Sequence, residues 1–341
     1  MIEEILNYCK ENNCSDVHIS SGSLISFRLN GEIFTLPNSE ILTKDEVYGY
    51  IKSITSQEQI ERYLVDLEID FAIQVDDVRF RANAYHTIKG PAIVFREIPP
   101  FIKKIEELNL PKSVKRFTNF PHGLVLIVGP TGHGKSSTLT ALIDIINTTQ
   151  KKHIITIEDP VEFVHSNKQC IIDQREVGSS AKSFSAALKS ALREDPDIIL
   201  VGEMRDLETI QLALTAAETG HLVFATLHTS SAVNTISRII DVFPANSQST
   251  VRSMLSSSLK AILSQHLVPG INGNRYPICE LMFASNSIKN LIRESNLHQI
   301  NSIIEISKKA GMITLRDSVK NLFDKGFVSE EVMSEIMANY K

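Results

Sequence analysis

The sequence predicts an α/β protein of two domains, and three observations support this fold class. The chain has 341 residues, which exceeds the usual length of one domain. From residue 121 onward, short apolar runs alternate with segments of helical periodicity, as in a parallel sheet with crossover helices. The residues before position 99 instead have the mixed helix and strand patterns of a separate, smaller domain. With 43% hydrophobic and 22% charged residues, the composition is that of a globular protein.

Residues 1–98 are predicted to form the small α/β domain, because helical and strand patterns alternate within them. A strand expected over residues 24–29 ends at Asn30-Gly31, a pair that is typical of a type I′ hairpin turn. Thr43 and Glu46 have the spacing of a capping box. That spacing predicts a helix that begins directly after Thr43.

A later strand of this domain places two arginines on one face. Arg79 and Arg81 alternate with apolar residues over 78–84, and a further strand candidate over 92–98 carries Arg96. Charged residues on such a face are often simply solvated. Guanidinium groups also bind phosphoryl oxygens bidentately, and in phosphoryl transfer they often come from another domain or subunit. Both interpretations stay open for the three arginines.

Pro99-Pro100 ends the strand pattern, and residues 99–120 are predicted to form a linker. Residues 121–270 form the predicted main domain and residues 271–341 a mostly helical end. Beyond residue 245 we expect mainly helices, with one strand around residues 278–282. The apolar runs that predict strands of the main domain are Leu124–Val128, Ile154–Ile157, Ile198–Val201 and Leu222–Ala225.

The most specific motif lies between the first of these runs and the helical segment after it. Residues 129–136 form a complete GxxxxGKS pattern. In such a loop the backbone N–H groups turn toward phosphate oxygens, Lys135 reaches the β- and γ-phosphates and the Ser136 hydroxyl holds Mg²⁺. The sequence therefore predicts ATP and Mg²⁺ as ligands. The residues predicted to line the nucleotide are Gly129, Pro130, Thr131, Gly132, His133, Gly134, Lys135, Ser136, Ser137 and Glu158. His133 is expected to contribute only its backbone N–H.

Carboxylates follow two other predicted strands. Glu158, Asp159 and Glu162 come after one apolar run, and Glu203 comes after another. Ligands collect at the carboxyl ends of parallel strands, and hydrolysis of a phosphate chain needs a group that orients and deprotonates water beside a metal. We therefore expect Glu203 to activate water and Glu162 to position the water or the metal. The alternative for each carboxylate is a helix cap or a solvated turn.

Two histidines flank another predicted strand of the main domain. His221 precedes the run and His228 follows it. An imidazole near the γ-phosphate could distinguish ATP from ADP through a hydrogen bond, so both histidines are candidates for linking the nucleotide to movement. A purely structural hydrogen bond is the alternative for each.

Charge and composition exclude several classes of protein. The net charge of −5 argues against a protein that coats nucleic acid, because such domains carry a basic excess. The four cysteines form no CxxC pair, so no zinc site is expected. No apolar run approaches roughly 18 residues, and no signal-peptide pattern opens the chain. We therefore expect a cytoplasmic protein that needs a partner to work at a membrane.

Taken together, these motifs resemble the secretion ATPase superfamily of type II secretion and type IV pili, and most closely its pilus retraction ATPases, the PilT-like group. The similarity extends over nearly the whole chain. Residues 192–209 match the long signature of the superfamily, residues 156–162 its Asp box and residues 221–228 its His box. Residues 15–22 resemble the opening of the family's PAS-like domain.

The resemblance implies a PAS-like amino-terminal α/β domain, followed by a RecA-like P-loop ATPase domain with a helical carboxyl-terminal region. It implies a homohexamer whose nucleotide sites are completed by arginines of the amino-terminal domain, here Arg79, Arg81 and Arg96. It also implies recruitment to the cytoplasmic face of the inner membrane by the platform protein of the pilus machine.

Residues 287–294 resemble a helical motif of the retraction branch, with Ser287 and Lys289 in place of the usual Ala and Arg. The long amino-terminal region and tetracysteine zinc module usual in extension and secretion ATPases are not found. We therefore expect a motor for pilus retraction and twitching motility. A pilus assembly or accessory secretion ATPase, a non-catalytic regulatory ring subunit and, more remotely, a DNA translocase are the alternatives.

The same motif has an apolar and a polar face. Apolar residues recur in it at helical spacing, which most often indicates packing in a core. The resemblance suggests in addition that the polar face, with Lys289, Arg293 and Glu294, couples ATP turnover to retraction.

Overall fold

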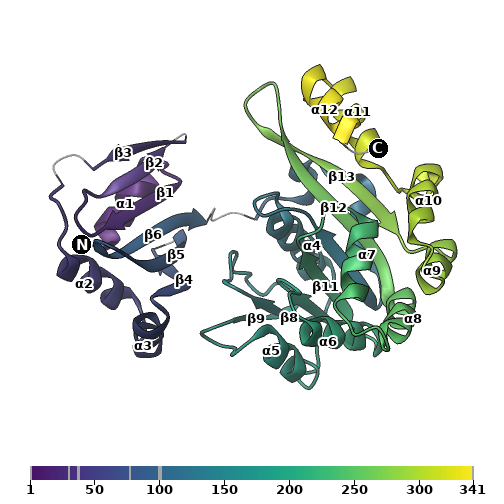
Figure 1. Cartoon of the computed structure of the whole chain (residues 1–341), viewed down its shortest axis with the longest axis horizontal. Helices are drawn as coiled ribbons and strands as arrows, with labels where there is room; N and C mark the ends of the chain where they lie inside the picture. The colour runs from purple at the N-terminus through teal and green to yellow at the C-terminus, as the bar shows by residue number, and fades with distance from the viewer. Residues whose placement is uncertain (1, 30, 37–38, 77, 99–101, 340–341) are drawn as a thin grey trace. The chain divides into compact units, whose positions relative to one another are not determined.

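The computed structural model consists of two compact units (Figure 1). It describes residues 2–29, 31–36, 39–76, 78–98 and 102–339. The first unit comprises Met1–Phe101, Asp159–Val164 and Glu176–Ser180, and the second comprises Ile102–Glu158, His165–Arg175 and Ala181–Lys341. Within the described residues, no helix combines the length and the apolar character that crossing a bilayer requires.

In the described part of the first unit, six strands form a sheet in the order β3-β2-β1-β6-β5-β4, with antiparallel pairing throughout. Side chains from this sheet share one hydrophobic core with helices α1, α2 and α3. The strands are β1 (Asp16–Ser20), β2 (Ser26–Leu29), β3 (Glu32–Thr35), β4 (Glu68–Val75), β5 (Val78–Thr87) and β6 (Gly90–Ile98). The helices are α1 (Ile2–Glu11), α2 (Lys44–Ile54) and α3 (Gln57–Asp66).

Two local predictions fall in this unit. Strands β2 and β3 pair with Leu29 opposite Glu32, as the predicted hairpin requires, while Asn30 of its turn lies outside the described residues. At the start of α2, the Glu46 N–H donates to the Thr43 hydroxyl over 3.3 Å, and the Thr43 N–H donates to the Glu46 carboxylate over 2.7 Å. The predicted capping box is therefore confirmed.

In the described part of the second unit, seven strands form a sheet in the order β13-β12-β7-β11-β10-β8-β9. Neighbouring strands from β12 to β8 run parallel, and β13 is antiparallel to β12. The four predicted apolar runs lie in β7, β8, β10 and β11, which confirms the parallel sheet. The strands are β7 (Gly123–Val128), β8 (His153–Glu158), β9 (Ile171–Glu176), β10 (Ile198–Val201), β11 (Leu222–Leu227), β12 (Leu259–Pro269) and β13 (Arg275–Phe283).

Helices follow most strands of this sheet, and a run of helices ends the chain (Figure 1). They are α4 (Lys135–Thr149), α5 (Phe184–Ala191), α6 (Leu207–Glu218), α7 (Ala232–Asp241), α8 (Gln248–Ser258), α9 (Asn286–Arg293), α10 (Ile300–Ile306), α11 (Leu315–Asp324) and α12 (Glu330–Asn339). The described part of the predicted linker contains the 3-10 helices η1 (Ile105–Leu108) and η2 (Lys112–Asn119). The predicted domain boundaries stay a prediction.

The expectation of mainly helical structure beyond residue 245 was wrong for β12, which is a strand of 11 residues. Three consecutive polar residues, Ser264, Gln265 and His266, interrupt its apolar pattern. All three are buried, because β12 lies between β7 and β13 in the sheet. Their polar atoms find partners elsewhere in the second unit, and a sequence pattern cannot show such partners.

The parallel strands bring several predicted site residues to one edge of the sheet. The phosphate loop follows β7, His228 follows β11 and Glu203 lies just after β10. In the ladder, Val128 at the end of β7 pairs with Leu227 of β11, and Ala225 pairs with Val201 of β10. Since the carboxyl ends of parallel strands meet at the same edge, these residues form one candidate site.

Candidate functional site

The glycines of the loop after β7 allow backbone conformations that other residues adopt at a cost. Gly129 has a φ of 145°, and a Cβ there would lie 2.2 Å from the carbonyl oxygen of Gln265. Gly132 and Gly134 have φ values of 77° and 82°, in the left-handed region. Helix α4 begins directly after Gly134, which has no side chain to cap it. The first N–H groups of α4 therefore face the loop, as in phosphate-binding loops.

Lys135 and Ser136 lie in the first turn of α4. The Lys135 ammonium donates to the carbonyl oxygens of Gly129 and Pro130 over 2.7 and 2.9 Å, which keeps it inside the loop. The Ser136 hydroxyl belongs to an exposed residue. An exposed hydroxyl oxygen at this position fits Mg²⁺, which prefers oxygen ligands and shares them with phosphates and water. Among the residues that the structure describes, no group of three or more His, Cys, Asp or Glu side chains could hold a metal ion.

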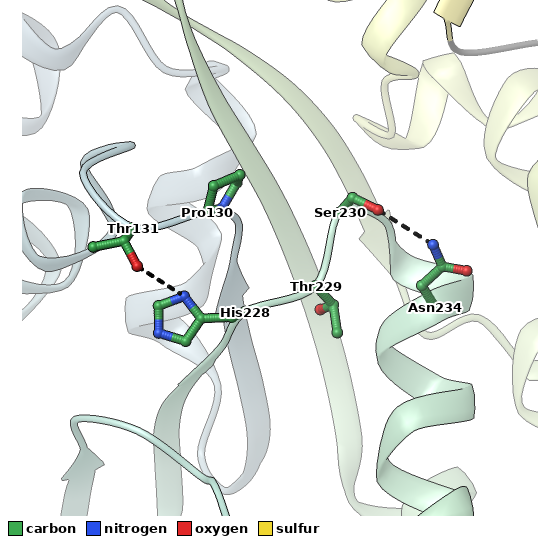
Figure 2. A pocket seen from close by; sticks show the side chains of 6 residues that line it. All are labelled: Pro130, Thr131, His228, Thr229, Ser230 and Asn234. Atoms are coloured by element: carbon green, nitrogen blue, oxygen red, sulfur yellow. Dashed lines mark hydrogen bonds between the residues drawn. The ribbon is translucent and has the colours of Figure 1, made fainter.

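His228 connects the phosphate loop with Glu203. Its Nδ1 atom lies 3.4 Å from the Thr131 hydroxyl, and its Nε2 atom lies 3.2 Å from a Glu203 carboxylate oxygen. Figure 2 shows the imidazole of His228 turned toward Thr131. One imidazole thus contacts both the phosphate loop and the Glu203 carboxylate.

Glu203 is ionised at neutral pH. Burial is the largest influence on its pKa and would raise it, but the hydrogen bond from Arg205 and the nearby His228 outweigh burial, so the pKa lies below its usual value. The Arg205 guanidinium donates to the second carboxylate oxygen over 2.7 Å. Glu203 therefore has the charge state that a proton acceptor needs.

A pocket of about 630 Å³ lies between the phosphate loop and the segment after β11 (Figure 2). Its volume falls in the range of sites for small molecules. Within it, the Asn234 amide donates to the Ser230 hydroxyl over 3.2 Å. The lining residues are Pro130, Thr131, His228, Thr229, Ser230 and Asn234.

Strands β12 and β13 hold the segment after β11 in place. The Ser264 hydroxyl donates to the Ser230 carbonyl over 2.8 Å, and His266 Nε2 lies 3.3 Å from the same oxygen. The Ala232 N–H, at the start of α7, donates to the Glu280 carboxylate over 2.7 Å. Burial raises the pKa of Glu280. Ser264 and His266 were missed because β12 was not predicted, and Glu280 was missed because its partner lies 48 residues away, although its strand was expected.

The His133 side chain has a structural role that the sequence did not indicate, while its predicted backbone contact with the nucleotide stays a prediction. Its ring Nδ1 accepts a hydrogen bond of 2.9 Å from the Leu267 N–H, and its ring packs edge-on against His266 with centroids 5.7 Å apart. Burial is the largest cause of a lowered His133 pKa, and His266 adds to it. His133 is thus the side chain through which the loop attaches to β12.

Glu158, at the end of β8, and Glu162, in the segment after it, have separate surroundings. Glu158 accepts hydrogen bonds from the Thr156 hydroxyl over 2.7 Å and from the Gln174 amide over 3.2 Å, which agrees with a structural role. Glu162 is half-buried and belongs to the segment Asp159–Val164, which is part of the first unit. The predicted roles of both residues stay predictions.

His221 lies at the opposite end of β11 from His228. Six strand residues separate them, so they are about 23 Å apart at a rise of about 3.3 Å per residue. The His221 ring is 3.0 Å from the Ala216 carbonyl and 3.3 Å from the Thr219 hydroxyl. This chain therefore does not bring His221 into the pocket, and its hydrogen bonds are those of a structural residue.

The three predicted arginines lie on the same face of the sheet in the first unit. Arg79 and Arg81 occupy the half-exposed positions of β5, and Arg81 pairs with Arg96 of β6 in the ladder. Each guanidinium has an acidic partner in this unit, at 2.9 Å for Arg79, 3.7 Å for Arg81 and 2.8 Å for Arg96. The partners are Glu176, Asp70 and Asp16, respectively.

These ion pairs differ in their surroundings. Arg96 is 71% exposed and neutralises Asp16, which is 5% exposed, so this arginine has a structural task of its own. Arg79 also donates to the Val161 carbonyl over 2.8 Å. Arg81 and Asp70 are both more than 40% exposed, and such pairs contribute little to stability. Of the three arginines, Arg81 thus has the ion pair that contributes least to stability.

Comparison with known families decides the classification. The family model described as "Type II/IV secretion system protein" matches residues 1–274. The chain belongs to this family. It is 48% identical over 331 residues to the "Type IV pilus retractation ATPase PilT" of Pseudomonas aeruginosa, which covers 97% of this chain and 96% of that relative. It is also 48% identical over 306 residues to a "Twitching motility protein" of Neisseria gonorrhoeae, with 89% and 82% coverage.

The fold agrees with a solved member of the family. A crystal structure of the pilus retraction motor PilT with bound ADP has a TM-score of 0.91 and 42% sequence identity, and covers 98% of this chain and 96% of that chain. The predicted fold class is confirmed, and so is the prediction of a P-loop ATPase of the PilT-like retraction group.

Proposed function

We propose that this chain hydrolyses ATP and uses the energy to power type IV pilus retraction and twitching motility. The observation that supports this proposal best is the arrangement of Glu203 and His228 beside the phosphate loop. An ionised carboxylate lies 3.2 Å from the imidazole, and the imidazole lies 3.4 Å from Thr131. This arrangement supplies a proton acceptor and a polar link to the phosphates, which a protein that only binds nucleotide does not need.

Each residue at this edge has a proposed task. The backbone N–H groups of the loop and Lys135 bind the β- and γ-phosphates, and Ser136 holds Mg²⁺. Bound Mg²⁺ supplies positive charge against the phosphate oxygens. Glu203 orients the attacking water and accepts its proton. His228 senses the γ-phosphate, because it touches both the loop and Glu203.

The remaining assignments concern the assembly. We place Glu162 as a second acidic group for water or Mg²⁺, and the β5 and β6 arginines as the groups that complete the site of a homohexamer. The domain boundaries at residues 98, 120 and 270 are part of this proposal. The ring would act in the cytoplasm, on the platform protein at the inner membrane. Support comes from the family resemblance and from relatives named for retraction and twitching motility.

Deletion of the gene tests the cellular task. We expect excess surface pili and no twitching, with both reversed by the wild-type gene but not by Lys135→Ala. Loss of surface pili would instead indicate an assembly ATPase. Purified protein that binds ATP without hydrolysing it would indicate a regulatory ring subunit.

A further inference from the structure

Gln265 of β12 is a buried side chain that joins the two halves of the phosphate-binding motif. It is 3% exposed. Its Nε2 atom donates to the His133 carbonyl of the loop over 2.8 Å, and its Oε1 atom accepts from the Thr138 hydroxyl of α4 over 2.7 Å. The donor and the acceptor of one amide are therefore both in use, one on the loop and one on the helix.

The backbone of β12 supports the same loop. A Cβ added to Gly129 would lie 2.2 Å from the carbonyl oxygen of Gln265, and a Cβ added to Gly134 would lie 2.8 Å from the Gln265 amide nitrogen. Glycine at both positions therefore lets the loop approach β12 closely. Two residues further along, the Leu267 N–H donates to the His133 ring over 2.9 Å. The loop is thus held along its length by one strand.

We infer that Gln265 is a positioning residue for ATP hydrolysis, which fixes the phosphate loop against α4 before the nucleotide arrives. The loop needs left-handed backbone at Gly132 and Gly134, so an unsupported loop would lose more conformational freedom when it binds phosphate. A loop that is already fixed presents its N–H groups at no such cost. Gln265 acts on the loop and touches no phosphate. The inference rests on the nucleotide-binding part of the proposed function.

Simple packing of β12 against the loop is the competing explanation, and the variant Gln265→Glu separates the two. A protonated glutamic acid can donate to the His133 carbonyl and accept from Thr138, as the amide does, whereas the ionised form has no donor. Burial favours the protonated form, so activity should return as the pH falls. Other titratable groups around this position are His133 and Lys135 of the loop and α4, Cys279 opposite on β13, and His266 on β12.

Gln265→Leu removes both hydrogen bonds and fills the position with an apolar side chain. The matched control is Gln150→Leu, because Gln150 donates to the Thr118 carbonyl over 2.8 Å at the far end of α4. We measure ADP binding by calorimetry and ATP hydrolysis by phosphate release, with the full chain, between pH 6 and 8.5. Melting temperatures of all variants are recorded.

The expected result has three parts. Gln265→Leu loses about tenfold or more in kcat/KM, because a buried partner is left without its hydrogen bond. Gln150→Leu stays within about twofold, because the hydrogen bond that it removes lies at the far end of α4 from the loop. Gln265→Glu resembles the leucine variant at pH 8.5 and recovers most of the loss at pH 6, relative to wild type at each pH.

Equal losses in Gln265→Leu and Gln150→Leu, or a glutamate variant whose pH profile follows the wild type, would overturn the inference. Absence of ADP binding by the wild type would instead refute the proposed function. If both Gln265 variants fail to fold, Thr138→Val removes the donor on α4 and retains the shape. A wild-type kcat/KM in that variant overturns the inference, and a several-fold loss at an unchanged melting temperature supports it.

Discussion

Glu203→Gln is the substitution that tests the proposed chemistry most directly. The amide has the size of the carboxylate and keeps an oxygen that can accept from Arg205 or His228, but it cannot take a proton from water. We therefore expect ATP to bind within a few-fold of wild-type affinity. Hydrolysis should be almost abolished.

The expected effect of Glu203→Gln on the rate is much larger than its expected effect on stability. Removal of a positioned base commonly lowers the rate by about 10²–10⁴, which corresponds to about 2.7–5.5 kcal/mol in the activation barrier. The effect on folding is small by comparison, because Arg205 is 66% exposed and an exposed ion pair contributes about 0–1 kcal/mol. A large loss of rate at a nearly unchanged melting temperature is therefore the expected signature.

Phosphate release at saturating ATP gives kcat, and calorimetry with a non-hydrolysable ATP analogue gives the affinity. Asp317→Asn is the matched control, since this carboxylate is 28% exposed and pairs with Lys308 over 2.8 Å in the helical end of the chain. It should hydrolyse ATP at the wild-type rate. Steady-state hydrolysis by Glu203→Gln within a few-fold of wild type would remove Glu203 from the catalytic role.

Three further predictions follow from the proposed function and the buried charges. Replacing Arg79 and Arg81 of β5 by alanine should leave the ADP affinity within a few-fold of wild type and slow hydrolysis at least about tenfold. A fragment of residues 110–341 should be nearly inactive. A fragment that hydrolyses ATP as fast as the full chain would contradict the trans-domain arrangement. Neutralising Lys289, Arg293 and Glu294 should preserve folding, assembly and ATPase rate but abolish pilus withdrawal, and intact withdrawal would show a merely solvated face. Burial raises the pKa of Glu280, so the folded state binds its proton more tightly than the unfolded state, and this stability is lost as the pH rises above the unfolded value. The melting temperature of Glu280→Gln minus that of the wild type should therefore be larger at pH 8 than at pH 5. An equal difference at both pH values would count against this account.

The strands and loop that form the nucleotide edge were predictable because their signals are local. β7, β8, β10 and β11 are apolar and buried on both faces, so they stand out as continuous runs. The GxxxxGKS spacing then places the loop between a strand and a helix. In α9, the apolar spacing correctly predicted packing, since Ile288 and Ile292 are fully buried. The function of its charged face has no comparable local signal.

The missed features depend on partners that are distant in sequence. Gln265 is buried because Thr138 and the His133 carbonyl satisfy its amide, 127 and 132 residues away. Nothing near residue 265 in the sequence indicates those partners. The same holds for Arg96, whose pairing with Asp16 spans 80 residues. Sequence reasoning therefore found charged and polar candidates without being able to separate structural partners from phosphate ligands.

His228 and His221 show how sheet direction makes that separation. Both flank β11, but the carboxyl end of a parallel strand faces the ligand edge and the amino end does not. In the sheet, β11 lies between β7 and β10, so the residue after β11 must lie between the phosphate loop and Glu203. The observed bridge from Thr131 through His228 to Glu203 follows from this strand order. His228 thus contacts both groups that the proposed γ-phosphate sensor would have to connect, and His221 contacts neither.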